Sequence, residues 1–191
     1  GGSALWQAAG KIIEKGKRIA AHFMEADVED MDYADGLFTV AGTDRSMSLV
    51  DVARSAFMHA KLPPDLEGGL FETATFSPEA DTFPNGAHVC EVEIDPETGQ
   101  VNLVSYSVVD DVGTVINPMG LKGQIHGGIA QGLGQALMEQ VVYDPDSGQI
   151  LSGSFMDYTM PRADTTCAIQ VESNPVPTKQ NPLGAKGAGE A

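Results

Sequence analysis

The stretch Asn117-Pro-Met-Gly-Leu-Lys-Gly-Gln-Ile-His-Gly-Gly-Ile-Ala-Gln-Gly-Leu-Gly-Gln-Ala-Leu-Met138 decides most of the fold. Asn117 is a favoured helix cap and Pro118 suits the first helical position, so we predict a helix over residues 118–139. Each internal glycine costs roughly 1 kcal/mol relative to alanine, which indicates that another backbone or a flat ligand approaches closely. Tight packing on a sheet, with solvated glutamines, is the open alternative. The residues concerned are Gly123, Gly127 and Gly134 on one stripe, with Gln124, Gln131 and Gln135 beside it.

Strand patterns surround this helix. Residues 87–94 and 101–109 alternate between apolar and polar side chains and are joined by an Asp-Pro turn, and residues 70–76 show a similar alternation. A second Asp-Pro turn covers residues 144–149, and a further strand is expected over residues 167–171. Either turn could suggest a calcium loop, but neither has the ligand spacing of an EF-hand. Helices mixed with hairpin-linked strands predict an α+β fold, with helices packed on mixed or antiparallel sheets.

The N-terminal part predicts a helix, a hairpin and a second helix. Ser3 can cap a helix over residues 4–25, and Asp35-Gly36 is a hairpin turn. Ser48 can cap the second helix, which we expect to end at Pro63-Pro64. The basic side chains of the first helix fall mainly on one face, which is typical of a solvated surface. These residues are Lys11, Lys15, Lys17 and Arg18.

Two regions follow from these patterns. Residues 1–62 form the helix–hairpin–helix region, and residues 63–191 form a strand-rich region that contains the glycine-rich helix and a C-terminal glycine-rich loop. His126 has no metal-ligand partner three or four positions away, so we interpret it as a structural histidine, and His88 is equally isolated.

Charge and hydropathy limit the partners. The net charge of −16 repels phosphate backbones, so we expect no nucleic acid partner. No run of 18 apolar residues is present, so no membrane span is expected. Cys90 and Cys167 lie in no CxxC pair, which disfavours iron–sulfur or zinc ligation within this chain and fits free thiols in a reducing cytoplasm.

The tail Gly184-Ala-Lys-Gly-Ala-Gly-Glu190 is the second candidate site. It is no Walker A loop, because Ser or Thr does not follow the Gly-Lys pair. Closely spaced glycines let backbone N–H groups converge on an anion or a bulky cofactor. Glu190 could then act as a general base in a dry pocket. A disordered glycine-rich tail is the alternative that composition alone leaves open.

Five motifs in this order resemble those of one family. The similarity extends over nearly the whole chain, and it is to the molybdopterin-binding large subunit of the xanthine dehydrogenase, aldehyde oxidase and aerobic carbon monoxide dehydrogenase family. The motifs are Cys90-Glu-Val-Glu-Ile-Asp95, Asp110-Asp-Val-Gly113 with Ile116-Asn-Pro118, Gly123 to Gln135, Tyr158-Thr-Met-Pro161, and Gly184 to Glu190.

The resemblance implies a role for individual residues. Glu190 matches the catalytic glutamate beside molybdenum, which accepts a proton as water-derived oxygen attacks an electron-poor carbon. Gln124, next to Gly123, matches the glutamine that approaches the pterin. The metal is held through the pterin rather than by the protein. The residues matching the loop that lines the cofactor are Lys186, Gly187, Ala188 and Gly189.

The resemblance also implies an assembly. The cofactor is molybdopterin with molybdenum, in bacterial members usually the cytosine dinucleotide form, and 2Fe-2S and FAD groups belong to partner domains or subunits. The family's other cofactor loops are absent from these 191 residues, so we expect a C-terminal fragment that needs the remainder of the molybdenum subunit. We expect the fragment alone to be inactive and to hold no molybdenum. Such enzymes oxidise aldehydes, N-heterocycles or carbon monoxide, and a non-catalytic assembly module of the same fold is the alternative.

Overall fold

The structure is a computed structural model that describes residues 1–189. It contains two compact units, Gly1–Ser77 and Pro78–Ala191, and each is described by itself. The division of the sequence at residues 62 and 63 stays a prediction about domains, whereas the compact units meet at Ser77 and Pro78.

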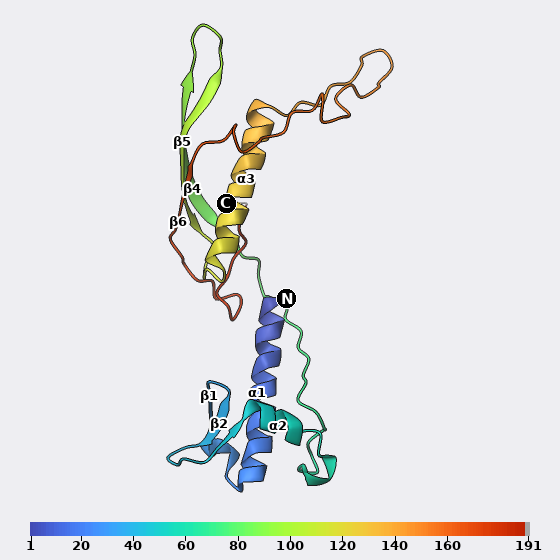
Figure 1. Ribbon diagram of the computed structural model, residues 1–191, viewed down its shortest axis with the longest axis vertical. Coiled ribbons are helices and arrows are strands. Elements are labelled where there is room, and N and C mark those ends of the chain that lie inside the picture. The colour runs from blue at the N-terminus through green and yellow to red at the C-terminus, as the bar shows by residue number, and fades with distance from the viewer. Residues whose placement is uncertain (190–191) are drawn as a thin grey trace. The chain divides into compact units, whose positions relative to one another are not determined.

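The first unit packs two helices on a small sheet (Figure 1). The sheet is antiparallel with the strand order β1-β2-β3. Asp35 and Gly36 both have positive φ, 49° and 78°, as a two-residue type I′ turn requires, which confirms the predicted hairpin. The elements are α1 (Gly2–Met24), β1 (Met31–Ala34), β2 (Leu37–Val40), β3 (Ser46–Ser48) and α2 (Leu49–Ser55), with 3₁₀ turns at Val28–Asp30 and His59–Lys61.

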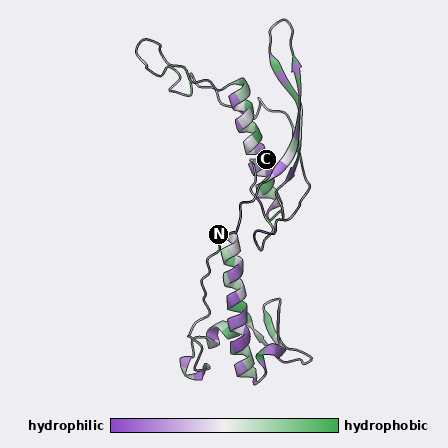
Figure 2. Cartoon of the chain, turned by 180° about the vertical axis from the view of Figure 1, so that it is seen from behind, coloured by the Kyte–Doolittle hydropathy of each residue, from purple (hydrophilic) through white to green (hydrophobic). Residues whose placement is uncertain are grey.

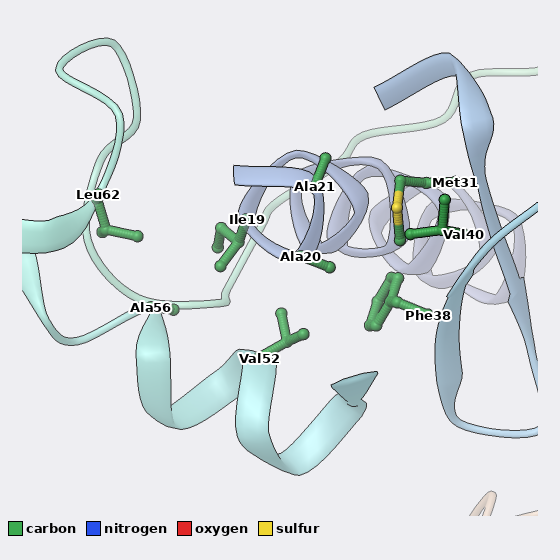
Figure 3. Packing of buried hydrophobic residues seen from close by; sticks show 9 residues of the cluster. All are labelled: Ile19, Ala20, Ala21, Met31, Phe38, Val40, Val52, Ala56 and Leu62. Carbon is green, nitrogen blue, oxygen red and sulfur yellow. The ribbon is translucent and has the colours of Figure 1, made fainter. Parts of the chain in front are cut away.

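A buried apolar cluster holds this unit together (Figure 3). Phe38 of β2 is fully buried and lies against Gly16 of α1, where any side chain would overlap its ring. Val52 of α2 is also fully buried, because the helix presents one apolar side to the cluster. The members are Ile19, Ala20, Ala21, Met31, Phe38, Val40, Val52, Ala56 and Leu62.

The helix ends confirm one predicted cap and correct two other expectations. The Ser48 side chain accepts from the Asp51 amide at 3.1 Å, as predicted for the second helix. Ser3 does not cap the first helix, because that helix already begins at Gly2 with Gly1 at the cap position. The second helix ends at Ser55, well before the Pro63-Pro64 pair.

The basic face of α1 is not simply solvated. Lys11 donates to the Thr73 carbonyl at 2.9 Å, and Lys15 lies 3.5 Å from Glu72. Arg18 pairs with Asp65. These lysines bind the segment where we expected a strand over residues 70–76, and that segment forms no strand because it has no neighbouring strand to pair with in the described chain.

The second unit places the glycine-rich helix beside a three-stranded sheet (Figure 1). The β4–β5 pair is antiparallel and the β5–β6 pair is parallel, so the sheet is mixed, as the predicted α+β fold requires. Asn117 caps α3 by accepting from the Gly120 amide at 2.9 Å, which confirms the prediction from the Asn-Pro pair. The elements are β4 (Asn85–Ile94), β5 (Val101–Asp111), α3 (Pro118–Leu137) and β6 (Ile169–Ser173).

The Asp-Pro segments are turns. Asp95 accepts from the Glu97 amide at 2.8 Å, and Asp144 accepts from the Ser147 amide at 2.8 Å. These hydrogen bonds lower the pKa of both carboxyls. Each carboxylate therefore satisfies the backbone of its own turn, as the turn interpretation predicts.

The core of the second unit is small. Val108 of β5 packs with Ile125 and Ile129 of α3. Many apolar side chains of the β4–β5 hairpin face outward, and their apolar colouring is visible along these strands in Figure 2. These are Val89, Val92, Ile94, Val101, Val104 and Val109. In the part of the chain that the structure describes, no helix combines the length and the apolar character needed to cross a membrane.

Candidate functional site

Strand β5 ends in two consecutive aspartates, Asp110 and Asp111, whose side chains contact different parts of the chain. Neighbouring residues of a strand point to opposite faces. The Asp111 carboxylate accepts from the amides of Gly113 at 2.8 Å and Val176 at 2.9 Å, and it pairs with the Lys186 ammonium at 2.5 Å. The Lys186 hydrogen bond, followed by the two amides, lowers the pKa of Asp111 to about 2. The carboxylate is therefore a charged anchor for distant parts of the chain.

The C-terminal loop, residues 184–189, is attached to this anchor. The Lys186 amide donates to the Val112 carbonyl at 2.8 Å, next to a bridge between Gly113 and Ala185. The Asn181 side chain donates to the Ala185 carbonyl at 2.8 Å and accepts from the Ala185 amide at 3.2 Å. Hydrogen bonds thus hold the loop as far as Lys186, unlike the disordered tail that composition left open.

Helix α3 and the loop meet through glycines. A Cβ on Gly128 would lie 2.6 Å from the Gly189 carbonyl oxygen, and Gly189 has φ 84° and lies against the Gln124 carbonyl. A side chain at either position would push the loop away from the helix. On the predicted stripe, Gly134 faces Pro161, whereas a Cβ on Gly123 or Gly127 would meet nothing within 4 Å. Close backbone approach therefore occurs, but at Gly128 rather than at Gly123.

The motif around Tyr158 supports the far end of α3. The Tyr158 hydroxyl donates to Glu139 at 2.6 Å, and this hydrogen bond raises the pKa of the tyrosine. A Cβ on Gly134 would come within 2.8 Å of Pro161. The Tyr158-Thr-Met-Pro161 motif therefore packs on the helix that carries Gln124.

A cavity of about 180 Å³ opens between the start of α3 and the C-terminal loop. We call it the Gln124 cavity. It brings together three of the predicted cofactor residues, Gln124, Lys186 and Ala188, which are separated by more than half of the second unit's sequence. Its other lining residues are Val112, Thr114, Val115, Ile116, Asn117, Leu121 and Ala185.

The remaining predicted residues do not line this cavity. A Cβ on Gly187 would lie 3.8 Å from the Pro84 ring, and Gly189 lines a different cavity. Gly123 lies on α3 one residue before Gln124, with its Cα toward open space. Glu190, the predicted base, lies outside the described residues. Its neighbour Gly189 is the last residue that the structure places.

A second cavity, of about 270 Å³, lies between the sheet and α3, and sequence reasoning missed it. We call it the His88 cavity. His88 is not isolated as expected: its Nδ1 lies 3.1 Å from the Tyr106 hydroxyl and its Nε2 lies 3.2 Å from Asp110. The sequence does place His88 on one predicted strand and Asp110 at the end of the next. Only the register of the two strands, however, shows that these side chains meet. The other lining residues are Ile125, Gly128, Ile129, Gly132, Leu133 and Gly189.

His126 and the two cysteines complete the inventory of reactive groups. The Nε2 of His126 is buried and, within residues 1–189, has no hydrogen-bond partner. Cys90 and Cys167 are free thiols, as expected. Within the same described residues, no group of three or more His, Cys, Asp or Glu side chains is arranged to hold a metal ion.

Comparison with known proteins identifies a family. Residues 1–167 match the model of a molybdopterin cofactor-binding domain. The chain is 36% identical, over 99% of its length, to the gamma subunit of the 6-hydroxypseudooxynicotine dehydrogenase complex of Paenarthrobacter nicotinovorans, and covers 24% of that protein. It is 36% identical, over its whole length, to the carbon monoxide dehydrogenase large chain of Hydrogenophaga pseudoflava, and covers 23% of it.

Solved structures agree. Reconstituted carbon monoxide dehydrogenase from Oligotropha carboxidovorans matches the whole chain with a TM-score of 0.90 at 34% identity, over 23% of its own length. Quinoline 2-oxidoreductase from Pseudomonas putida 86 matches 97% of the chain with a TM-score of 0.86 at 40% identity, over 24% of its own length. The chain thus spans about a quarter of the length of the curated relatives it matches.

Proposed function

The chain belongs to the molybdopterin cofactor-binding domain family, and we propose that it forms one wall of the active site of a molybdenum-dependent hydroxylase or dehydrogenase. Such an enzyme oxidises an aldehyde, an N-heterocycle or carbon monoxide and takes its oxygen from water. The relatives' names, which include nicotine, quinoline and carbon monoxide enzymes, support N-heterocycles and carbon monoxide within this range.

The Gln124 cavity is the observation that carries the proposal. It adjoins the loop at Lys186 and Ala188, and its rim carries the amide side chains of Gln124 and Asn117. Amides both donate and accept, which suits the mixed edge of a pterin. The cavity holds only part of such a cofactor, and the chain covers only about a quarter of its relatives. The residues present therefore fit one side of a molybdopterin, in its cytosine dinucleotide form by analogy with the bacterial family.

The residues of this chain would hold the cofactor and orient it. When bound, the cofactor supplies a two-electron acceptor and activates water. The amide of Gln124, which lines the cavity, would bind the pterin edge. Lys186 is held by Asp111, so its ammonium fixes the loop. The amides of Gly184, Ala185 and Lys186 are used within the chain, so the backbone N–H groups that would bind the cofactor are those of Gly187, Ala188 and Gly189.

We assign proton transfer to Glu190. It follows Gly189, which lies against the Gln124 carbonyl and Gly128 of α3. A carboxylate at this position would accept the proton lost from the attacking oxygen. Gly128 and Gly189 thus act as positioning residues for the proposed base.

The assembly needs further parts. The outward apolar face of β4 and β5 supports burial against the remainder of the molybdenum subunit. FAD and 2Fe-2S partners would carry electrons away, and the free thiols fit a cytoplasmic enzyme. The chain alone would then be inactive and hold no molybdenum.

The test is Glu190→Gln in the complete enzyme, with Glu97→Gln in an exposed turn as the matched control. We expect turnover to fall by about 10²–10⁴-fold, the usual contribution of a general base, while metal analysis finds the molybdenum content unchanged. The control should keep its turnover. Retained turnover in Glu190→Gln contradicts the base assignment. An assembly with native contacts but no bound molybdenum would instead support a structural module.

A further inference from the structure

The His88 cavity has a polar wall that the proposed function does not use. Asp110 is only 2% exposed, and Gly86 on the paired strand leaves the space that its carboxylate occupies, because a Cβ there would overlap it. His88 bridges Asp110 and Tyr106 through its two ring nitrogens. One buried carboxylate and two aromatic polar groups therefore form a connected network along β4 and β5.

Donors and acceptors in the network can be assigned from its geometry. A carboxylate only accepts, so we assign the proton between the two groups to the Nε2 of His88. The Nδ1 of a neutral imidazole then accepts from the Tyr106 hydroxyl. Burial first, then the nearby Cys90 and Asp110, raise the pKa of Tyr106, which keeps that hydroxyl protonated. The polar wall therefore offers the ligand acceptors: the second carboxylate oxygen and the phenol lone pairs.

The opposite wall is apolar and flat. Ile125, Ile129 and Leu133 of α3 supply aliphatic surface, and Gly132 leaves a gap in which a Cβ would meet nothing within 4 Å. An apolar cavity of about 150 Å³ admits benzene, so the 270 Å³ here has room for one small aromatic ring with a polar substituent.

We propose that the His88 cavity is a binding site for a small planar aromatic molecule that carries N–H donors or a positive charge. Its ring lies on the apolar side chains of α3, and its donors face Asp110 and Tyr106. Gly189 closes one side of the cavity, so a bound molecule lies beside the C-terminal loop. Within residues 1–189, the cavity is lined by residues of β4, β5, α3 and the C-terminal loop.

Benzamidine tests the proposal, because it is a flat aromatic cation with N–H donors. It is titrated into the complete enzyme that contains this chain, and binding is measured by calorimetry. A benzamidine-soaked crystal of that enzyme should place the ring against Gly128, Gly132 and Gly189. Benzoate, which has the same ring and the opposite charge, should bind at least about tenfold more weakly, since its carboxylate has no N–H to donate to Asp110.

Two substitutions on one helix locate the site. Gly132→Leu fills the cavity and should weaken benzamidine at least about tenfold, because the ring loses its space. Gly127→Leu is the matched control: it lies on the same helix, its Cβ also meets nothing within 4 Å, and it does not line the cavity. It should bind within about twofold of the unchanged chain.

Asp110→Asn adds an independent check on the polar wall. It keeps the side-chain size and removes the charge, so benzamidine should again weaken by about tenfold. Absence of benzamidine binding in the unchanged enzyme overturns the proposal. Equal affinity for benzoate, or equal loss in both leucine variants, overturns it as well. The base role of Glu190 is tested by turnover, whereas the His88 cavity is tested by benzamidine binding. One proposal can therefore be contradicted while the other stands.

Discussion

The two units of the chain are stabilised in different ways. Residues 1–77 enclose an apolar cluster in which Phe38 and Val52 are fully buried. Residues 78–189 bury only Val108, Ile125 and Ile129 together and rely on a charged pair, Asp111 with Lys186, to hold their loop. The first unit therefore depends mainly on apolar packing, whereas the second depends more on hydrogen bonds and on one ion pair between distant parts of its chain.

The strongest test of this contrast is Phe38→Ala. The substitution removes a fully buried ring from the first unit, so the free energy of unfolding of that unit should fall by about 3–5 kcal/mol. Urea unfolding followed by NMR reports each unit separately. Phe57→Ala, at a ring that is 65% exposed, is the control and should change little. If amides of the second unit lost protection equally, the units would not be independent.

Acid should release the second unit's loop while the first unit's core persists. The pKa of Asp111 is about 2 against an ordinary 3.8, so the stabilisation is complete above pH 3.8 and is lost as the pH falls toward and below 2. The amides of Gly113 and Val176 should lose protection from hydrogen exchange in that window. Asp111→Ala should show the loss already at neutral pH. Equal protection at pH 2 and pH 5 in the unchanged chain would contradict the anchor.

The smallest expected effect separates two glycines of α3. Gly132→Ala should stabilise the helix by up to about 1 kcal/mol, because alanine is the better helix former and its Cβ meets nothing. Gly128→Ala should give no such gain, because its Cβ would lie 2.6 Å from the Gly189 carbonyl. Thermal unfolding measures the difference, and the Gly189 amide shift reports the displaced loop. Equal stabilisation by both variants would mean that the loop does not rest on the helix.

The elements that sequence predicted correctly depend on local signals. The Asn117-Pro118 start of α3 and the Asp35-Gly36 hairpin are set by residues that satisfy or bend their own backbone. The alternation of residues 70–76 was misleading, because alternation predicts a half-buried strand only if a partner strand exists. Lysines of α1 bind that segment instead.

The candidate site was predicted only in its parts. The Gln124 and Lys186 motifs were recognised, and the structure places both around one cavity. The Asp111–Lys186 pair joins residues 75 positions apart, and the His88–Asp110 pair depends on strand register. No local pattern encodes such contacts, since they arise only when the chain has folded.

The side chains of Asp110 and Asp111 are adjacent in sequence but have separate roles. Asp111 pairs with Lys186 and holds the C-terminal loop, whereas Asp110 lines the His88 cavity beside α3. A randomised library confined to positions 88, 106 and 110 would therefore vary the shape and charge of the His88 cavity and leave the Asp111–Lys186 pair intact. Ligand preference in this part of the protein can diverge without altering the contacts that hold the loop.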